Sequence, residues 1–136
     1  MKAAAMMTGT AMLALAGCPM DEPAPDLVEI SGLTNAPPAS KATIVNRDGD
    51  GHDVYEIELS LGVAIATRCW DTCGPDSVCT FAKLTAGDPA ILGVRPVYRG
   101  GRREGEFALI ASRAGTTTLH VQTSCTGRDY RVTVRP

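Results

Sequence analysis

Apolar residues follow two different patterns along the chain. Residues 3–16 are an unbroken run of Ala, Met, Leu, Thr and Gly without an ionisable side chain. From Val54 onwards, apolar side chains instead recur mostly at every second position, above all in segments 54–65, 116–123 and 130–134. A period of two is typical of strands that bury one face. Because no stretch after residue 20 has the 3.6-residue period of an amphipathic helix, the sequence predicts an all-β fold.

Turn signals divide this β pattern into about seven short strands. Gly, Pro, Asp and Asn interrupt the apolar runs at intervals of about 8–12 residues, a spacing typical of a β-sandwich. Gly62 is expected to break one long run, and Trp70 is expected in the loop that follows it. The expected strands lie at 27–30, 54–65, 78–84, 90–98, 107–111, 116–123 and 130–134, and 42–45 is a further short apolar run.

The N-terminal apolar run has the layout of a secretory signal peptide. Lys2 supplies a positive charge, residues 3–16 are apolar, and small residues close the run. With 14 residues, the run is shorter than the stretch of about 20 that a spanning helix needs. A buried core helix would need a polar face, which this run lacks. Residues 1–17 are therefore predicted to be a signal peptide.

The end of the signal peptide and the residue after it, Leu15-Ala16-Gly17-Cys18, resemble the lipobox of bacterial lipoproteins. In that family the cysteine thiol receives a diacylglyceryl group, cleavage makes the cysteine the first residue, and its amine is often acylated too. The resemblance implies that Cys18 carries acyl chains such as palmitate and anchors the protein to a membrane. Pro19, rather than Asp, follows the cysteine, which in this family favours the outer membrane or the cell surface over the inner membrane.

Residues 19–26 read as a tether between Cys18 and the folded part. They contain three prolines and three acidic residues and almost nothing apolar, so a semi-extended, solvated segment is expected. Residues 18–26 thus form the lipidated cysteine and its tether, and residues 27–136 have the length of one domain.

Within that domain, residues 54–136 resemble the bacterial immunoglobulin-like domains of group 2. The resemblance lies in a strand that ends at a glycine and leads into the next strand (58–63), in a turn before a short apolar strand (88–92), and in the Ala-Gly-Thr entry to the penultimate strand (114–121). It implies an immunoglobulin-like β-sandwich.

Four cysteines remain besides Cys18, and they suit two disulfides in an oxidising compartment: Cys69, Cys73, Cys79 and Cys125. In the fold that the resemblance implies, all four lie at one end of the sandwich, which favours Cys69–Cys125 between the sheets and Cys73–Cys79 within the loop. The alternative is a zinc site with four cysteine ligands, but the spacing C-x3-C-x5-C is not that of a zinc ribbon.

Segment 46–53 carries oxygen side chains at every second position and resembles the first half of a calcium loop, such as that of an EF-hand or dockerin repeat. Asn46, Asp48 and Asp50 are the candidate ligands of Ca²⁺. Ile57 stands where such a loop has its bidentate Glu. Since Asp-Gly is also a strong turn signal, a polar hairpin turn is the alternative.

Other chemistry is sparse in the sequence. The net charge of −2 and the aromatic content of 4% do not favour nucleic acid as a partner. The motifs of serine hydrolases, zinc proteases and phosphate loops are absent, so no enzyme is expected. His52 and His120 are expected in solvent. Trp70 is either a recognition aromatic or a cap over the disulfides.

A cluster of arginines can be interpreted in two ways. It could meet anionic lipid or lipopolysaccharide, or it could form a solvated mixed-charge loop with Glu104 and Glu106. Its members are Arg95, Arg99, Arg102 and Arg103.

The sequence as a whole predicts a lipid-anchored lipoprotein of the cell envelope that acts as a non-catalytic binding, adhesion or structural module. Its partners would be the membrane and an envelope protein or a polysaccharide. The alternative is a calcium-binding or metal-dependent envelope protein that uses the 46–53 loop.

Overall fold

The computed structural model of the chain describes residues 25–30, 40–49, 51–71, 79, 81–97 and 105–136. The predicted signal peptide, Cys18, most of the tether and Cys73 lie outside the described residues. So do Asp50, Glu104 and three of the four clustered arginines, Arg99, Arg102 and Arg103. Within the described segments every regular element is a strand, and none of them contains a helix able to cross a membrane.

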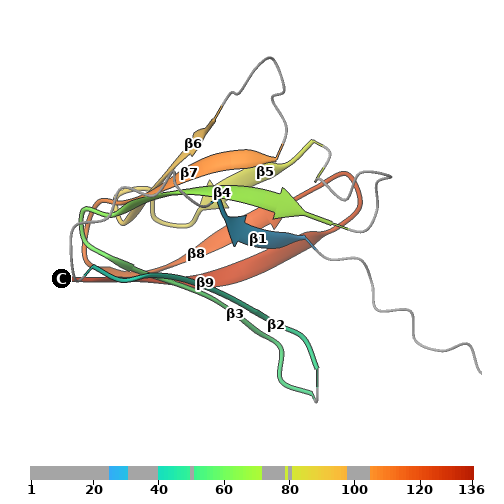
Figure 1. Ribbon diagram of the computed structural model, residues 1–136, viewed down its shortest axis with the longest axis horizontal. Helices are drawn as coiled ribbons and strands as arrows, with labels where there is room; N and C mark the ends of the chain where they lie inside the picture. Colours follow the sequence, from blue (N-terminus) through green and yellow to red (C-terminus); the bar gives the residue numbers. More distant parts are fainter. Residues whose placement is uncertain (1–24, 31–39, 50, 72–78, 80, 98–104) are drawn as a thin grey trace, which may run out of the picture.

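Four strands form the first sheet, in the order β1-β4-β7-β6 (Figure 1). They are β1 (Asp26–Glu29), β4 (Ala64–Trp70), β7 (Glu106–Ala111) and β6 (Leu92–Pro96). All neighbours in this sheet are antiparallel.

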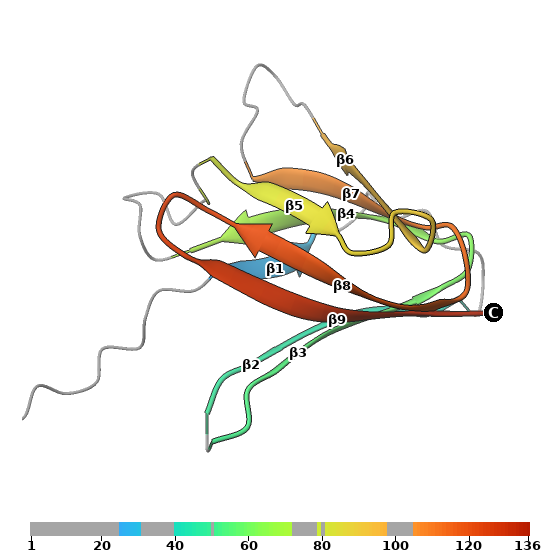
Figure 2. The same cartoon turned by 180° about the vertical axis from the view of Figure 1, so that it is seen from behind.

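Five strands form the second sheet, in the order β2-β3-β9-β8-β5 (Figure 2). They are β2 (Ala42–Arg47), β3 (Val54–Ser60), β9 (Gly127–Arg135), β8 (Gly115–Gln122) and β5 (Lys83–Ala86). The pair β3–β9 is parallel and the other pairs are antiparallel.

The two sheets pack face to face as the predicted immunoglobulin-like β-sandwich. The orders β1-β4-β7-β6 and β5-β8-β9 reproduce the ABED and CFG sheets of a constant-type immunoglobulin domain. The described residues contain nine strands rather than about seven, because the run expected at 54–65 is divided at Gly62 between β3 and β4, and the short run at 42–45 forms a further strand, β2. Strands β2 and β3 form a hairpin on the β9 edge of the second sheet. This hairpin diverges from the body of the sandwich towards its tip (Figures 1 and 2).

The core lies between the sheets and follows the period of two in the sequence. Alternate residues of the strands point inwards, so that one face is buried in most of them, whereas the edge strand β2 has no fully buried residue. The largest fully buried side chains include Tyr130, Leu27, Ile57, Leu59, Ile65, Leu92, Leu109 and Leu119. Gly62 has a φ of +82° in the turn between β3 and β4, which confirms the expected break at this glycine.

Two expected boundaries were wrong. Trp70 is the last residue of β4 and not part of the loop. The strand expected at 78–84 begins only at Lys83, since Phe81 has a φ of +53° and so leaves the extended region of the backbone.

Candidate functional site

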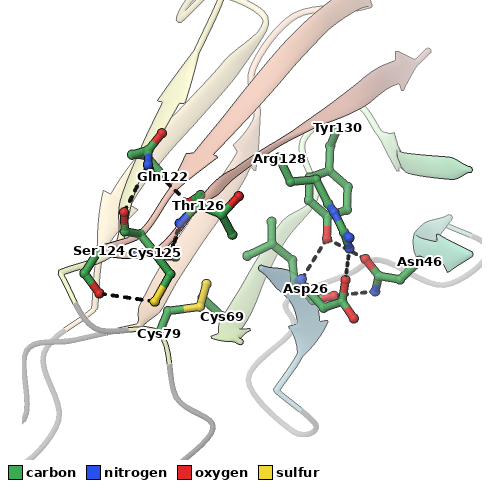
Figure 3. The surroundings of a disulfide bond; sticks show 12 residues. Asp26, Asn46, Cys69, Cys79, Gln122, Ser124, Cys125, Thr126, Arg128 and Tyr130 are labelled. Carbon is green, nitrogen blue, oxygen red and sulfur yellow. Dashed lines mark hydrogen bonds and ion pairs between the residues drawn. A yellow bond between two sulfur atoms is a disulfide. The ribbon is translucent and has the colours of Figure 1, made fainter. Parts of the chain in front are cut away.

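One end of the sandwich gathers most of the unusual chemistry of the described residues. It is named here the cysteine end, after Cys69, Cys79 and Cys125 (Figure 3). Strand β4 ends there with Trp70, β5 begins there, and the turn from β8 to β9 carries Cys125. Strand β1 also begins there, because Asp26 lies opposite Trp70 in the register of the sheet.

The disulfide at this end joins Cys69 to Cys79, with a Cα–Cα distance of 5.3 Å. The expected pair Cys69–Cys125 is therefore wrong, and so is Cys73–Cys79. Cys69 points into the core from β4, and its carbonyl oxygen accepts a hydrogen bond of 3.1 Å from the backbone N–H of Cys79. This hydrogen bond and the disulfide hold Cys79 beside the end of β4, and both cysteines are fully buried. Cys125 is also disulfide-bonded.

The turn that carries Cys125 is held by its own side chains. The Thr123 hydroxyl accepts hydrogen bonds of 3.3 Å from the N–H groups of Cys125 and Thr126, and it donates one of 3.1 Å to the Thr126 carbonyl. The Gln122 amide donates to the same carbonyl, at 3.2 Å. Exposed Cys125 is therefore fixed in position although its turn is short.

A polar cluster beside the disulfide ties β1 to the opposite sheet (Figure 3). We call it the β1 latch, and its members are Asp26, Leu27, Asn46, Arg128 and Tyr130. The Tyr130 hydroxyl accepts a hydrogen bond of 2.8 Å from the Leu27 N–H and donates one of 2.5 Å to Asn46 Oδ1. Asn46 Nδ2 donates to the Leu27 carbonyl at 2.8 Å, which closes a ring of three hydrogen bonds.

Charged groups complete the latch. Arg128 forms an ion pair with Asp26 and lies 3.7 Å from the centre of the Tyr55 ring, in a cation–π contact. Burial raises the pKa of Asp26, and the charge of Arg128 opposes this effect. Burial also raises the pKa of Tyr130 to about 12. Tyr130 therefore stays neutral and keeps its donor proton at physiological pH.

The candidate calcium ligands do not converge in the described residues. Asn46 lies in β2 and directs its amide to Leu27 and Tyr130 instead of to the turn. Asp48 lies 3.5 Å from Arg128, and Asp50 is outside the described residues. Segments β2 and β3 pair as an antiparallel hairpin around this turn, and no group of three or more potential metal ligands occurs in the part of the chain that the structure describes. The prediction that Asn46, Asp48 and Asp50 bind Ca²⁺ is untested.

The two histidines are exposed. On the outer face of the second sheet, His120 Nδ1 lies 2.6 Å from Asp129 and Nε2 lies 3.3 Å from Gln122. The hydrogen bond with Asp129 raises the pKa of His120.

A shallow depression of about 410 Å³ opens nearby, where β3 diverges from β9. It is lined by Asp53, Val54, Tyr55, Glu56, Thr118, Asp129, Tyr130 and Arg131.

Trp70, Arg68 and Arg95 lie on the outer face of the first sheet. Because neighbouring residues of a strand point to opposite faces, Trp70 faces away from the core while Cys69 faces into it. The Arg68 guanidinium lies 5.9 Å from the Trp70 ring and pairs with Glu106 at 2.5 Å. Arg95 is exposed on β6.

Sequence reasoning gave no functional role to Phe81, the most exposed large apolar residue among those described, at 75% exposure. It follows Cys79 by two positions at the cysteine end. A signal was present in the sequence, because Phe81 is one of only two phenylalanines and stands between the cysteine-rich segment and charged Lys83. The pattern alone placed it inside a strand, where it could have been buried.

The fold and the site define the class of the chain as an immunoglobulin-like β-sandwich with a disulfide at one end. No protein-family model matches the chain, and no curated protein matches it. A search of solved structures found the crystal structure of the S-layer protein SbsC domains 4 and 5, with 14% sequence identity and a TM-score of 0.45. The match covers 71% of this chain and 54% of the SbsC chain, which is about half of the length of the SbsC chain. The fold class assigned above rests on the strand order of the chain itself.

Proposed function

We propose that this protein is a lipid-anchored module of the bacterial cell envelope that binds or supports another envelope component and does not catalyse a reaction. The observation that carries the proposal is the short distance between anchor and fold. Asp26, the first residue of β1, follows Cys18 by only eight positions. The sandwich thus begins almost directly after the lipobox.

The physical chemistry of acyl chains supports anchoring without a spanning helix. Each buried methylene contributes about 0.8 kcal/mol, and stable anchoring takes about two chains. A diacylglyceryl group on Cys18 supplies two. The eight-residue tether spans at most about 29 Å when fully extended, which keeps the sandwich close to the lipid surface.

The use of the polar side chains supports a non-catalytic role. Asn46 and Tyr130 serve the β1 latch, His120 pairs with Asp129, and Arg68 pairs with Glu106. These side chains, which could otherwise be ligands or bases, are thus engaged in contacts within the domain. The partner we propose is an envelope protein or a polysaccharide, and the membrane we propose is the outer membrane, because Pro19 follows the lipidated cysteine.

The test is the variant Cys18→Ser, expressed in a bacterial host with a lipoprotein pathway. The wild-type protein is expected to stay with membranes after carbonate extraction, and the variant is expected in the soluble fraction. Met20→Ser is the matched control, since it changes the chain beside the lipobox and keeps the thiol. Mass spectrometry of the wild-type protein should show an N-terminal acylated cysteine. Membrane retention of Cys18→Ser, or an unmodified thiol, would refute the anchor.

A further inference from the structure

The structure indicates which end of the sandwich faces the anchor. Strand β1 begins at the cysteine end, where Asp26 lies opposite Trp70. The chain ends at the opposite end, after Arg135 (Figure 1). The tether from Cys18 therefore joins the domain at the cysteine end, and its length holds that end within about 29 Å of the lipids.

Phe81 projects from this same end. It lies two residues after Cys79, which the disulfide fixes to the end of β4, and two residues before Lys83, where β5 begins opposite Gln122. Phe81 is 75% exposed. The disulfide at Cys79 and the pairing of Lys83 with Gln122 attach described residues on both sides of Phe81 to the sandwich.

The backbone at Phe81 is strained. Its φ of +53° is in the left-handed region, which a bulky residue other than glycine rarely adopts. Strain of this kind persists where the surrounding structure imposes it, and it is concentrated at functional sites. In this protein the strained conformation presents a large apolar ring to solvent instead of burying it.

We infer that the cysteine end docks on the bilayer surface, with the Phe81 ring in the boundary between headgroups and acyl chains. This inference rests on the proposed lipid anchor. Aromatic rings are favoured at that depth, and an apolar side chain beside a basic one is typical of surfaces that lie on membranes. Lys83 is exposed next to Phe81 and provides the basic group for anionic headgroups. The docked domain turns its opposite end, with Leu61, away from the lipids.

The test measures the fluorescence of a single tryptophan that is placed at one chosen position. Trp70 is the only tryptophan, so the double variants W70F/F81W and W70F/L61W each report one position. Leu61 is the matched control, because it is also an exposed apolar residue, at 47%, and lies in the turn at the other end. The full-length, lipidated proteins are reconstituted into vesicles of phosphatidylcholine and phosphatidylglycerol with brominated or unbrominated acyl chains. Matching circular dichroism spectra check that both variants are folded.

We expect brominated lipid to reduce the tryptophan emission of W70F/F81W and to leave that of W70F/L61W unchanged. Flotation of the same vesicles and the mass of the protein report anchoring separately. A protein that floats and carries its acyl chains, but shows equal quenching or no quenching at the two positions, overturns docking and leaves the anchor intact. A protein without acyl chains that does not float overturns the anchor, and the docking inference with it.

Discussion

The β1 latch allows a quantitative prediction from one oxygen atom. The variant Tyr130→Phe removes the hydroxyl that links the Leu27 N–H to Asn46 and leaves the buried ring in place. Leu27 is fully buried, so its N–H loses its acceptor in a place that water does not reach. A buried polar group without a partner costs about 1–3 kcal/mol. Asn46 is only partly buried and can bind water instead, so we expect a loss of about 2 kcal/mol in the free energy of unfolding.

Urea unfolding followed by circular dichroism measures this loss. The midpoint should fall while the slope stays constant, since the surface exposed on unfolding is unchanged. The melting temperature of a domain of this size should fall by about 10 °C. The control is Tyr55→Phe, which makes the same chemical change in the ring that packs edge-on against Tyr130 at 5.8 Å. The Tyr55 hydroxyl makes no hydrogen bond within the described residues, so this variant should lose less than about 0.5 kcal/mol.

The pH dependence gives an independent check on the same hydroxyl. The folded pKa of Tyr130 is raised to about 12, above the unfolded value of 10.0. The unfolded chain therefore loses its proton first, and wild-type stability should fall as the pH rises from about 10 to about 12, by up to about 3 kcal/mol. Tyr130→Phe lacks this ionisation, so the gap between the two proteins should narrow above pH 10. Equal stabilities for the Tyr130 and Tyr55 variants at neutral pH would refute the latch.

Three further predictions concern other sites. The imidazole of His120 should titrate in NMR above its usual value of 6.5, and Asp129→Asn should return the pKa towards that value; the stability that this pair contributes is present below pH 6.5 and is lost as the pH rises through the folded pKa. Peptide mapping without reduction should recover Cys69 joined to Cys79, which leaves Cys73 as the expected partner of Cys125; a Cys69–Cys125 peptide would contradict the structure. Because Asn46 is held in the latch, millimolar Ca²⁺ should leave the melting temperature unchanged, and a rise that is lost in Asp50→Asn would restore the calcium hypothesis.

Local patterns predicted the fold well because strands and turns depend on neighbouring residues. Alternation after Val54 and the break at Gly62 were sufficient for an all-β sandwich. The sequence offered a hairpin turn at 46–53 as an alternative, but strand β2 before it was less evident, because the apolar run at 42–45 is short. Edge strands contribute few buried side chains, and so their periodicity is weak.

The site was harder to predict because its contacts are distant in sequence. Asn46 carries a side-chain oxygen that could bind a metal, yet this oxygen accepts a hydrogen bond from the hydroxyl of Tyr130, 84 positions away. Cysteine pairing depends on which sulfur atoms the fold brings together, and spacing does not reveal this. Phe81 has an apolar side chain typical of a core, and its exposure follows from one backbone angle that composition does not encode.

The place of β1 has a mechanical consequence for a tethered protein. If the protein is anchored through Cys18 as proposed, a pull between the anchor and a partner would enter the fold at Asp26, the residue that Arg128 holds by an ion pair. Strand β1 runs antiparallel to β4 through four paired residues, so a load along its axis must shear these backbone hydrogen bonds together. The hydrogen bonds of Leu27 with Tyr130 and Asn46 also connect β1 to the second sheet, one residue after Asp26.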